Sequence, residues 1–150
     1  MTRRIQLARL ALAILAIAGI PTAHAAACTV STSGLNFGNY DVFSSLNDDV
    51  TGTINVNCPS GTNYSIWLSS GTSGTYSSRS MTNGPYTLSY NLFTDPTRLT
   101  IWGDGSAGTG TFSGAGTGSI IGTPVYGRIP AGQNAYVGSY ADSVTVTVTF

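Results

Sequence analysis

The sequence predicts an all-β protein, an antiparallel β-sandwich or barrel, and three observations favour this fold class. Apolar residues recur at every second position in several short runs, which is the period of a strand with one buried face. Turn-forming Gly, Pro, Asn and Asp residues separate these runs. No stretch beyond the N-terminal leader repeats apolar residues at the helical spacing i, i+3, i+4, i+7.

The first element is a leader: residues 1–25 have the three parts of a secretory signal peptide, which leaves residues 26–150 as one domain. Three arginines precede an apolar stretch from Leu10 to Ile20, and Ala23 and Ala25 provide small residues for cleavage. The apolar stretch is too short to span a bilayer comfortably, and no later run is long enough. We therefore expect export and no membrane anchor in the mature protein.

The strands expected next along the chain differ in how clearly they alternate. The clearest runs are Thr53–Cys58, Tyr64–Leu68, Leu88–Leu92 and Val144–Phe150. Shorter candidates are Leu35–Gly38, Leu99–Trp102 and Val125–Ile129. The glycine-rich segment 103–118 is expected to be a flexible loop or a hairpin of small residues, since it lacks the Lys and the helix pattern of a phosphate-binding loop.

The charged residues argue against catalysis and against nucleic-acid binding. The chain has six Arg and six Asp, with neither Lys nor Glu, and its single histidine, His24, lies in the leader. Three Arg and six Asp remain beyond the leader, a formal charge of −3. Most general acids, bases and metal ligands are thus missing, as is a basic patch for nucleic acid or an anionic membrane. We expect no catalytic residues, no cofactor and no metal site.

The remaining aspartates and tryptophans are expected to have structural roles rather than catalytic or sugar-binding ones. Most aspartates stand beside Gly, Pro or Asn, where capping of a turn is the common role. Trp67 is out of phase with Tyr64, Ile66 and Leu68, so on a regular strand it faces away from them. It is a possible surface contact, and packing or subunit contact is favoured over a sugar-stacking platform formed with Trp102 and the tyrosines.

Cys28 and Cys58 are the only cysteines, and in an exported protein they most simply form one disulfide. Two free thiols or a two-ligand metal site are the weaker alternatives.

The run Val144–Phe150 places Val144, Val146, Val148 and Phe150 on one face and three threonines on the other. It is the last run of the sequence and carries no charge, although charge or proline usually protects an exposed strand edge. We therefore expect this strand to receive a partner strand by β-augmentation. A strand paired on both sides within its own sheet is the alternative.

Several segments together resemble the spore coat protein U domain family, which includes subunits of archaic, Csu-type chaperone–usher pili. They are ACTVSTSGLNFGNYDVF (27–43), TGTINVNC ending at Cys58, RSMTNGPYTLSYNLFTD (79–95), TIWGDG (100–105), VYGRIPAGQ (125–133) and GSYADSVTVTVTF (138–150). The resemblance covers nearly the whole mature chain in the family's order.

The resemblance implies an immunoglobulin-like sandwich that lacks its last strand and is exported to the periplasm of a Gram-negative bacterium. It implies three kinds of partner: a periplasmic chaperone that lends a strand, an outer-membrane usher, and other pilin subunits that exchange donor strands. By matching position, Val144, Val146, Val148 and Phe150 would line the groove for that strand. The cysteine pair would join the first strand to the second.

One departure from the family pattern concerns the donor strand. Cleavage after Ala25 would leave only Ala26 and Ala27 before Cys28, too few residues to fill a neighbour's groove. We therefore expect a non-catalytic surface subunit at a fibre tip or outside a polymer, found at the cell surface or extracellularly. The alternative is a free-standing secreted coat, matrix or carbohydrate-binding β-sandwich.

Overall fold

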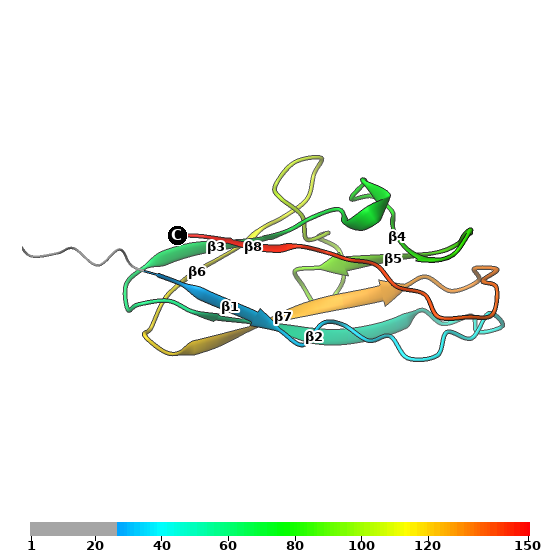
Figure 1. The fold of residues 1–150 in the computed structure, drawn as a ribbon, viewed down its shortest axis with the longest axis horizontal. Helices are drawn as coiled ribbons and strands as arrows, with labels where there is room; N and C mark the ends of the chain where they lie inside the picture. The colour runs from blue at the N-terminus through cyan, green and yellow to red at the C-terminus, as the bar shows by residue number, and fades with distance from the viewer. Residues whose placement is uncertain (1–26) are drawn as a thin grey trace, which may run out of the picture.

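A computed structural model describes residues 27–150, and the predicted leader lies outside these residues. The chain forms two sheets in which all paired strands are antiparallel (Figure 1). One sheet has the order β1 (Thr29–Thr32), β2 (Asp48–Asn57), β7 (Ile120–Ile129), β5 (Tyr86–Phe93) and β4 (Arg79–Asn83). The other has the order β6 (Phe112–Ala115), β3 (Asn63–Leu68) and β8 (Val146–Thr149). A one-turn 3-10 helix, η1, spans Gly71–Ser73.

The core lies between the two sheets and follows the predicted alternation. Buried residues occupy every second position of β2, β3 and β5: Ile54 and Val56, then Tyr64, Ile66 and Leu68, then Leu88, Tyr90 and Leu92. Trp102, Val125 and Ile129 complete the buried cluster. The prediction of an all-β, immunoglobulin-like antiparallel sandwich is confirmed. Within residues 27–150 no helix is long and apolar enough to cross a membrane.

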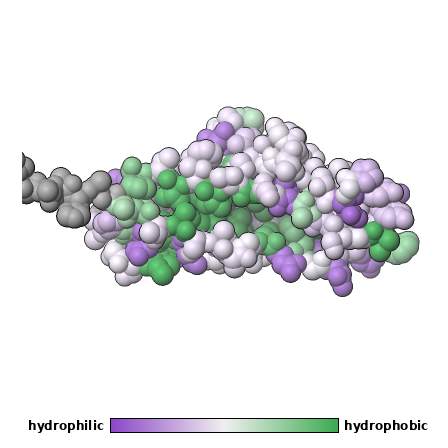
Figure 2. Space-filling model, in the orientation of Figure 1, coloured by the Kyte–Doolittle hydropathy of each residue, from purple (hydrophilic) through white to green (hydrophobic). Residues whose placement is uncertain are grey.

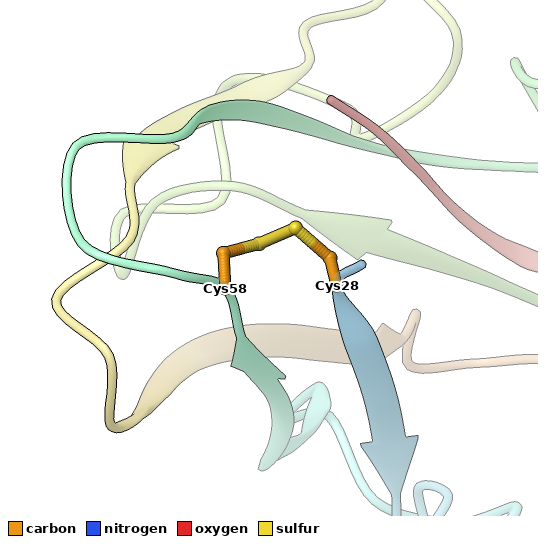
Figure 3. The surroundings of a disulfide bond; sticks show 2 residues. All are labelled: Cys28 and Cys58. Atoms are coloured by element: carbon orange, nitrogen blue, oxygen red, sulfur yellow. A yellow bond between two sulfur atoms is a disulfide. The ribbon is translucent and has the colours of Figure 1, made fainter. Parts of the chain in front are cut away.

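The disulfide joins Cys28 to Cys58, as predicted (Figure 3). Thr29 pairs with Asn57 at the start of β1 and the end of β2, so the two cysteines stand opposite each other one position further on. The bond therefore fastens the short edge strand β1 to the long strand β2.

Several predicted strand boundaries were wrong. Leu35–Gly38 is not a strand, because Gly34 and Gly38 both have positive φ (75° and 78°) and turn the chain at each end. Leu99–Trp102 forms only isolated bridges, at Ile101 and Trp102. The final strand begins at Val146 rather than Val144, and β7 extends back to Ile120.

The glycine-rich segment contains both a loop and a strand. Residues 103–111 form a loop closed by hydrogen bonds such as that from the Gly103 N–H to the Gly110 C=O at 2.9 Å. The segment then enters β6, which pairs with β3. Just before it, Trp102 is 0% exposed and its Nε1 donates to the Ile66 C=O, so Trp102 contributes to no surface platform.

Arg79 is a fully buried cation that ties the two sheets together. Its guanidinium extends from β4 and donates to the Ser69 C=O after β3, to the Trp102 C=O and to Asn91 Oδ1 in β5. Burial lowers the pKa of Arg79, and the tyrosines and Asp142 nearby partly counter that effect. Four hydrogen bonds to fixed acceptors compensate for the loss of hydration.

Candidate functional site: an open groove between the sheets

An apolar groove of about 460 Å³ opens along one side of the sandwich. Its floor consists of core residues from both sheets: Ile54, Leu68, Tyr90, Leu92 and Val125. Residues 32–37 form one border, the N-terminal lip, and residues 140–146 form the other, the C-terminal lip. In Figure 2, hydrophobic residues form a strip along the middle of this face, where Figure 1 places β1 and the C-terminal segment.

Both lips lead to strands that stand at the edge of a sheet. In the described part of the chain β1 pairs only with β2, and β8 pairs only with β3. The Ser69 N–H donates to the Thr145 C=O, and hydrogen-bonded pairs alternate along an antiparallel ladder. The backbone groups of Thr147 and Thr149 therefore point toward β3, and those of Val146 and Val148 point toward the open edge.

The structure brings three of the four residues predicted for the groove onto the core side of this segment. Val144 and Val146 line the groove, and Val144, Val146 and Val148 are partly buried against the core. Phe150 follows β8, is 60% exposed and lines a second, shallower depression instead. The role of these residues as contacts of an incoming strand stays a prediction.

Asp142 holds the C-terminal lip in place. Its Oδ1 accepts hydrogen bonds from Thr72 N, Thr72 Oγ1 and Ser143 N at 2.9, 2.7 and 2.8 Å. Its Oδ2 accepts the hydroxyl of Tyr90, a floor residue, at 2.6 Å. Partial burial acts to raise the pKa of Asp142, but these donors together outweigh it and leave the pKa below its ordinary value. Burial, followed by the bond to Asp142, raises the pKa of Tyr90.

The N-terminal lip packs directly on the five-stranded sheet, where two glycines make room for it. A Cβ at Gly52 or Gly127 would overlap the side chain of Leu35, and one at Gly127 would also meet the ring of Phe37. The lip is anchored further along by Tyr40, whose hydroxyl donates to the Pro130 C=O and accepts the Gln133 N–H, both at 2.9 Å. Sequence reasoning missed this role of Leu35 and Phe37 because it assigned them to a strand.

Four of the other five aspartates serve local structure. Asp41, Asp95 and Asp104 accept backbone N–H groups two to five residues along the chain, as the turn-capping prediction expected. Asp49 pairs with Arg128 at 2.7 Å and with Arg98 at 3.3 Å. The hydrogen bond from Arg128 is the main reason that the pKa of Asp49 is lowered. Among residues 27–150 no three His, Cys, Asp or Glu side chains cluster as metal ligands would.

A second surface feature lies at the end of the sandwich away from the C-terminus (Figure 1). The Ala131 N–H donates to Asn47 Oδ1, and the rings of Tyr86 and Tyr136 stack at 4.4 Å, so three loops meet there. These loops and the start of β5 expose large apolar side chains: Phe43 (94%), Leu46 (77%), Tyr86 (43%), Tyr136 (58%) and Val137 (85%). Sequence alternation gave no signal for this cluster, because four of its five residues lie outside the strands.

Fold and groove together define a disulfide-bonded antiparallel β-sandwich with an apolar groove open between two sheet edges. The chain belongs to the Spore Coat Protein U domain family, whose model matches residues 13–147. It is 38% identical over 141 residues to Protein U of Myxococcus xanthus, a match that covers 83% of this chain and 78% of that protein. The predicted family is thereby confirmed.

A solved structure shares the fold. It is the crystal structure of the CsuC–CsuE chaperone–tip adhesion subunit pre-assembly complex from the archaic chaperone–usher Csu pili of Acinetobacter baumannii. The TM-score is 0.63 at 22% identity, and the match covers 83% of this chain. This chain spans 40% of the length of the matched chain.

Proposed function

We propose that this protein is a non-catalytic subunit of a chaperone–usher type surface fibre and accepts an extended donor strand along the open edge of β8. The observation that carries the proposal is the groove, which combines an apolar floor with the unpaired edge of a neighbouring strand. An added strand would use the backbone groups of Val146 and Val148 for a ladder and would place alternate apolar side chains over the floor.

The donor strand comes first from a periplasmic chaperone and then from another pilin subunit, with an outer-membrane usher assembling the fibre. The fold shared with a subunit solved together with its chaperone supports a chaperone as a partner of this chain. The chain is accordingly exported through the periplasm of a Gram-negative bacterium to the cell surface. The histidine-free domain predicted from the sequence is consistent with a subunit that performs no chemistry.

We place the subunit at the distal end of the fibre, where its exposed apolar loops would contact a surface. Exposed Phe43, Leu46 and Val137 support an adhesive role, since clustered apolar side chains on a protein surface mark interaction sites. Immunogold labelling of assembled fibres tests this placement. Label confined to fibre ends agrees with it, and label along the shaft contradicts it.

Amide hydrogen exchange, measured on the mature chain with and without its chaperone, tests strand acceptance. The amides of Val146 and Val148 are expected to become protected in the complex. Those of Thr147 and Thr149, already bonded to β3, serve as the internal control and change little. Unchanged exchange at both valines, in a complex that does form, contradicts strand addition at this edge.

A matched pair of variants provides a second readout. Val146→Asp puts a charge into the groove, whereas Thr147→Asp puts the same charge on the outer face of the same strand. Co-purification with the chaperone should be lost for the first and kept for the second. A wild-type chain that stays monomeric and protease-resistant without any chaperone favours the free-standing secreted domain instead.

A further inference from the structure

The outer face of the three-stranded sheet carries a row of hydroxyl groups beside a tryptophan. Ser65 in β3 pairs with Ser113 in β6 on one side and with Thr149 in β8 on the other. Trp67 stands two residues further along β3 and pairs with Thr147. Because paired residues share a face, these five side chains form one continuous surface, which we call the hydroxyl face.

The hydroxyl face is hollowed at its serine end. A depression of about 420 Å³ is lined by Asn63, Ser65, Ser113, Thr149 and Phe150, among others. Small side chains line the centre of the depression, where Ser65 and Ser113 meet with their Oγ atoms 3.3 Å apart. Trp67 lies about 7 Å along the strand from Ser65, the distance of two residues in an extended chain.

The chemistry of the hydroxyl face is polar, aromatic and uncharged. The strands β3, β6 and β8 contain no Asp, Glu, Lys or Arg. Hydroxyl and amide groups can both donate and accept hydrogen bonds, which suits a ligand that is itself rich in hydroxyls. An indole offers a flat apolar surface against which the C–H face of a sugar ring can stack.

We propose that the hydroxyl face is a binding site for a neutral oligosaccharide, with one sugar ring on Trp67 and the next in the depression around Ser65. The lack of charged groups disfavours acidic saccharides, which need cationic partners. The depression is shallow and wide, which fits a chain of sugar rings better than a single deeply buried ligand.

This site is independent of strand acceptance in the groove. Val146 and Val148 point to the core side of β8, whereas Thr147 and Thr149 point to the hydroxyl face. A donor strand would extend the sheet at its edge and leave the hydroxyl face uncovered. The site can therefore be tested on the chaperone-bound chain.

Tryptophan fluorescence offers a direct assay, since the chain has two tryptophans and Trp102 is 0% exposed. In the chain without its chaperone, acrylamide quenching then reports mainly on Trp67. The probes are cellohexaose, maltohexaose and chitohexaose, with hexagalacturonate as the acidic comparison. At least one neutral hexasaccharide is expected to protect Trp67 from quenching, and hexagalacturonate is not.

Variants connect the binding to the named residues. Calorimetric affinity should fall about tenfold or more for Trp67→Ala, while Trp67→Tyr keeps most of it because a ring remains. Ser65→Val, which fills the depression, should also weaken binding. Phe43→Ala removes an exposed aromatic from the opposite end and should change nothing.

The proposal is overturned if no neutral hexasaccharide binds at millimolar concentration, if hexagalacturonate binds more tightly, or if binding survives Trp67→Ala. Slow amide exchange at Thr147 and Thr149, which are bonded to β3 within the chain, shows that each variant has folded. Amide exchange at Val146 and Val148 reports on strand acceptance separately, so each proposal can fail without the other.

Discussion

Replacing Asp142 by alanine is expected to release the C-terminal lip of the groove. The substitution removes the acceptor of four hydrogen bonds, but these are unequal. Thr72 and Ser143 are exposed, so water replaces the carboxylate there at little cost. Tyr90 is only 5% exposed, and leaving its hydroxyl without a partner costs about 1–3 kcal/mol. We expect a total loss of about 2 kcal/mol, or about 6–10 °C in Tm.

A double-mutant cycle with Tyr90→Phe isolates the decisive bond. The free energy of unfolding is measured in urea for the wild type, Asp142→Ala, Tyr90→Phe and the double variant, with the disulfide intact. In the Tyr90→Phe background, which lacks the hydroxyl, Asp142→Ala should lower the free energy of unfolding by about 1–2 kcal/mol less than it does in the wild type. Asp104→Ala is the matched control, because Asp104 caps an exposed turn and should change stability by less than about 0.5 kcal/mol. Additive single effects would refute the view that the Tyr90–Asp142 bond holds the lip to the floor.

Three further outcomes are expected. Replacing both Cys28 and Cys58 by alanine should lower the free energy of unfolding by about 3–4 kcal/mol, from the loop-closure entropy of a sequence separation of 30, as measured by chemical denaturation. Because the folded-state pKa of Asp142 is lowered, its contribution is complete at neutral pH and is lost as the pH falls through that pKa. In urea titrations from pH 7 to about 2, the difference in unfolding free energy between the wild type and Asp142→Ala should narrow in acid, and a constant difference would contradict this. Gly127→Ala should push the N-terminal lip off the sheet and speed amide exchange in residues 34–38. Gly122→Ala should not, because its Cβ would press only on Thr53 Cγ2, at 3.1 Å, on the outer face away from the lip.

The sequence was sufficient to predict the sheets wherever one strand face is buried. Ile54, Ile66 and Tyr90 each sit in a run of strict alternation, and a one-residue slip would expose every apolar side chain of the run. For the same reason the outward position of Trp67 was predictable. The disulfide was predictable because the chain has only two cysteines and is expected to be exported to an oxidising compartment. The register at Thr29 and Asn57 explains why the two cysteines stand close enough to bond.

The borders of the groove were not predictable, because tertiary contacts rather than periodicity determine them. Leu35 and Phe37 alternate like strand residues, yet flanking glycines with positive φ leave them as a lip without a ladder. Gly127 lies within the predicted strand Val125–Ile129, and the strand pattern carries no signal that Leu35 and Phe37 pack on it. No sequence pattern around Arg79 predicts burial, and only the three-dimensional arrangement of its carbonyl and amide acceptors accounts for it.

The strongest physical argument that the groove is functional is that, within the described chain, one sheet edge is covered while the two edges nearest the groove are not. Proteins usually protect an exposed edge with charge, proline or a covering segment. The outer edge of β4 is covered in this way, since Thr82 and Ala141 exchange two backbone hydrogen bonds. By contrast β1 and β8, the edge strands nearest the lips, contain neither charge nor proline. Unprotected edges beside an apolar floor would be a liability in a finished domain, and a single added strand would remove both the open ladder and the exposed floor.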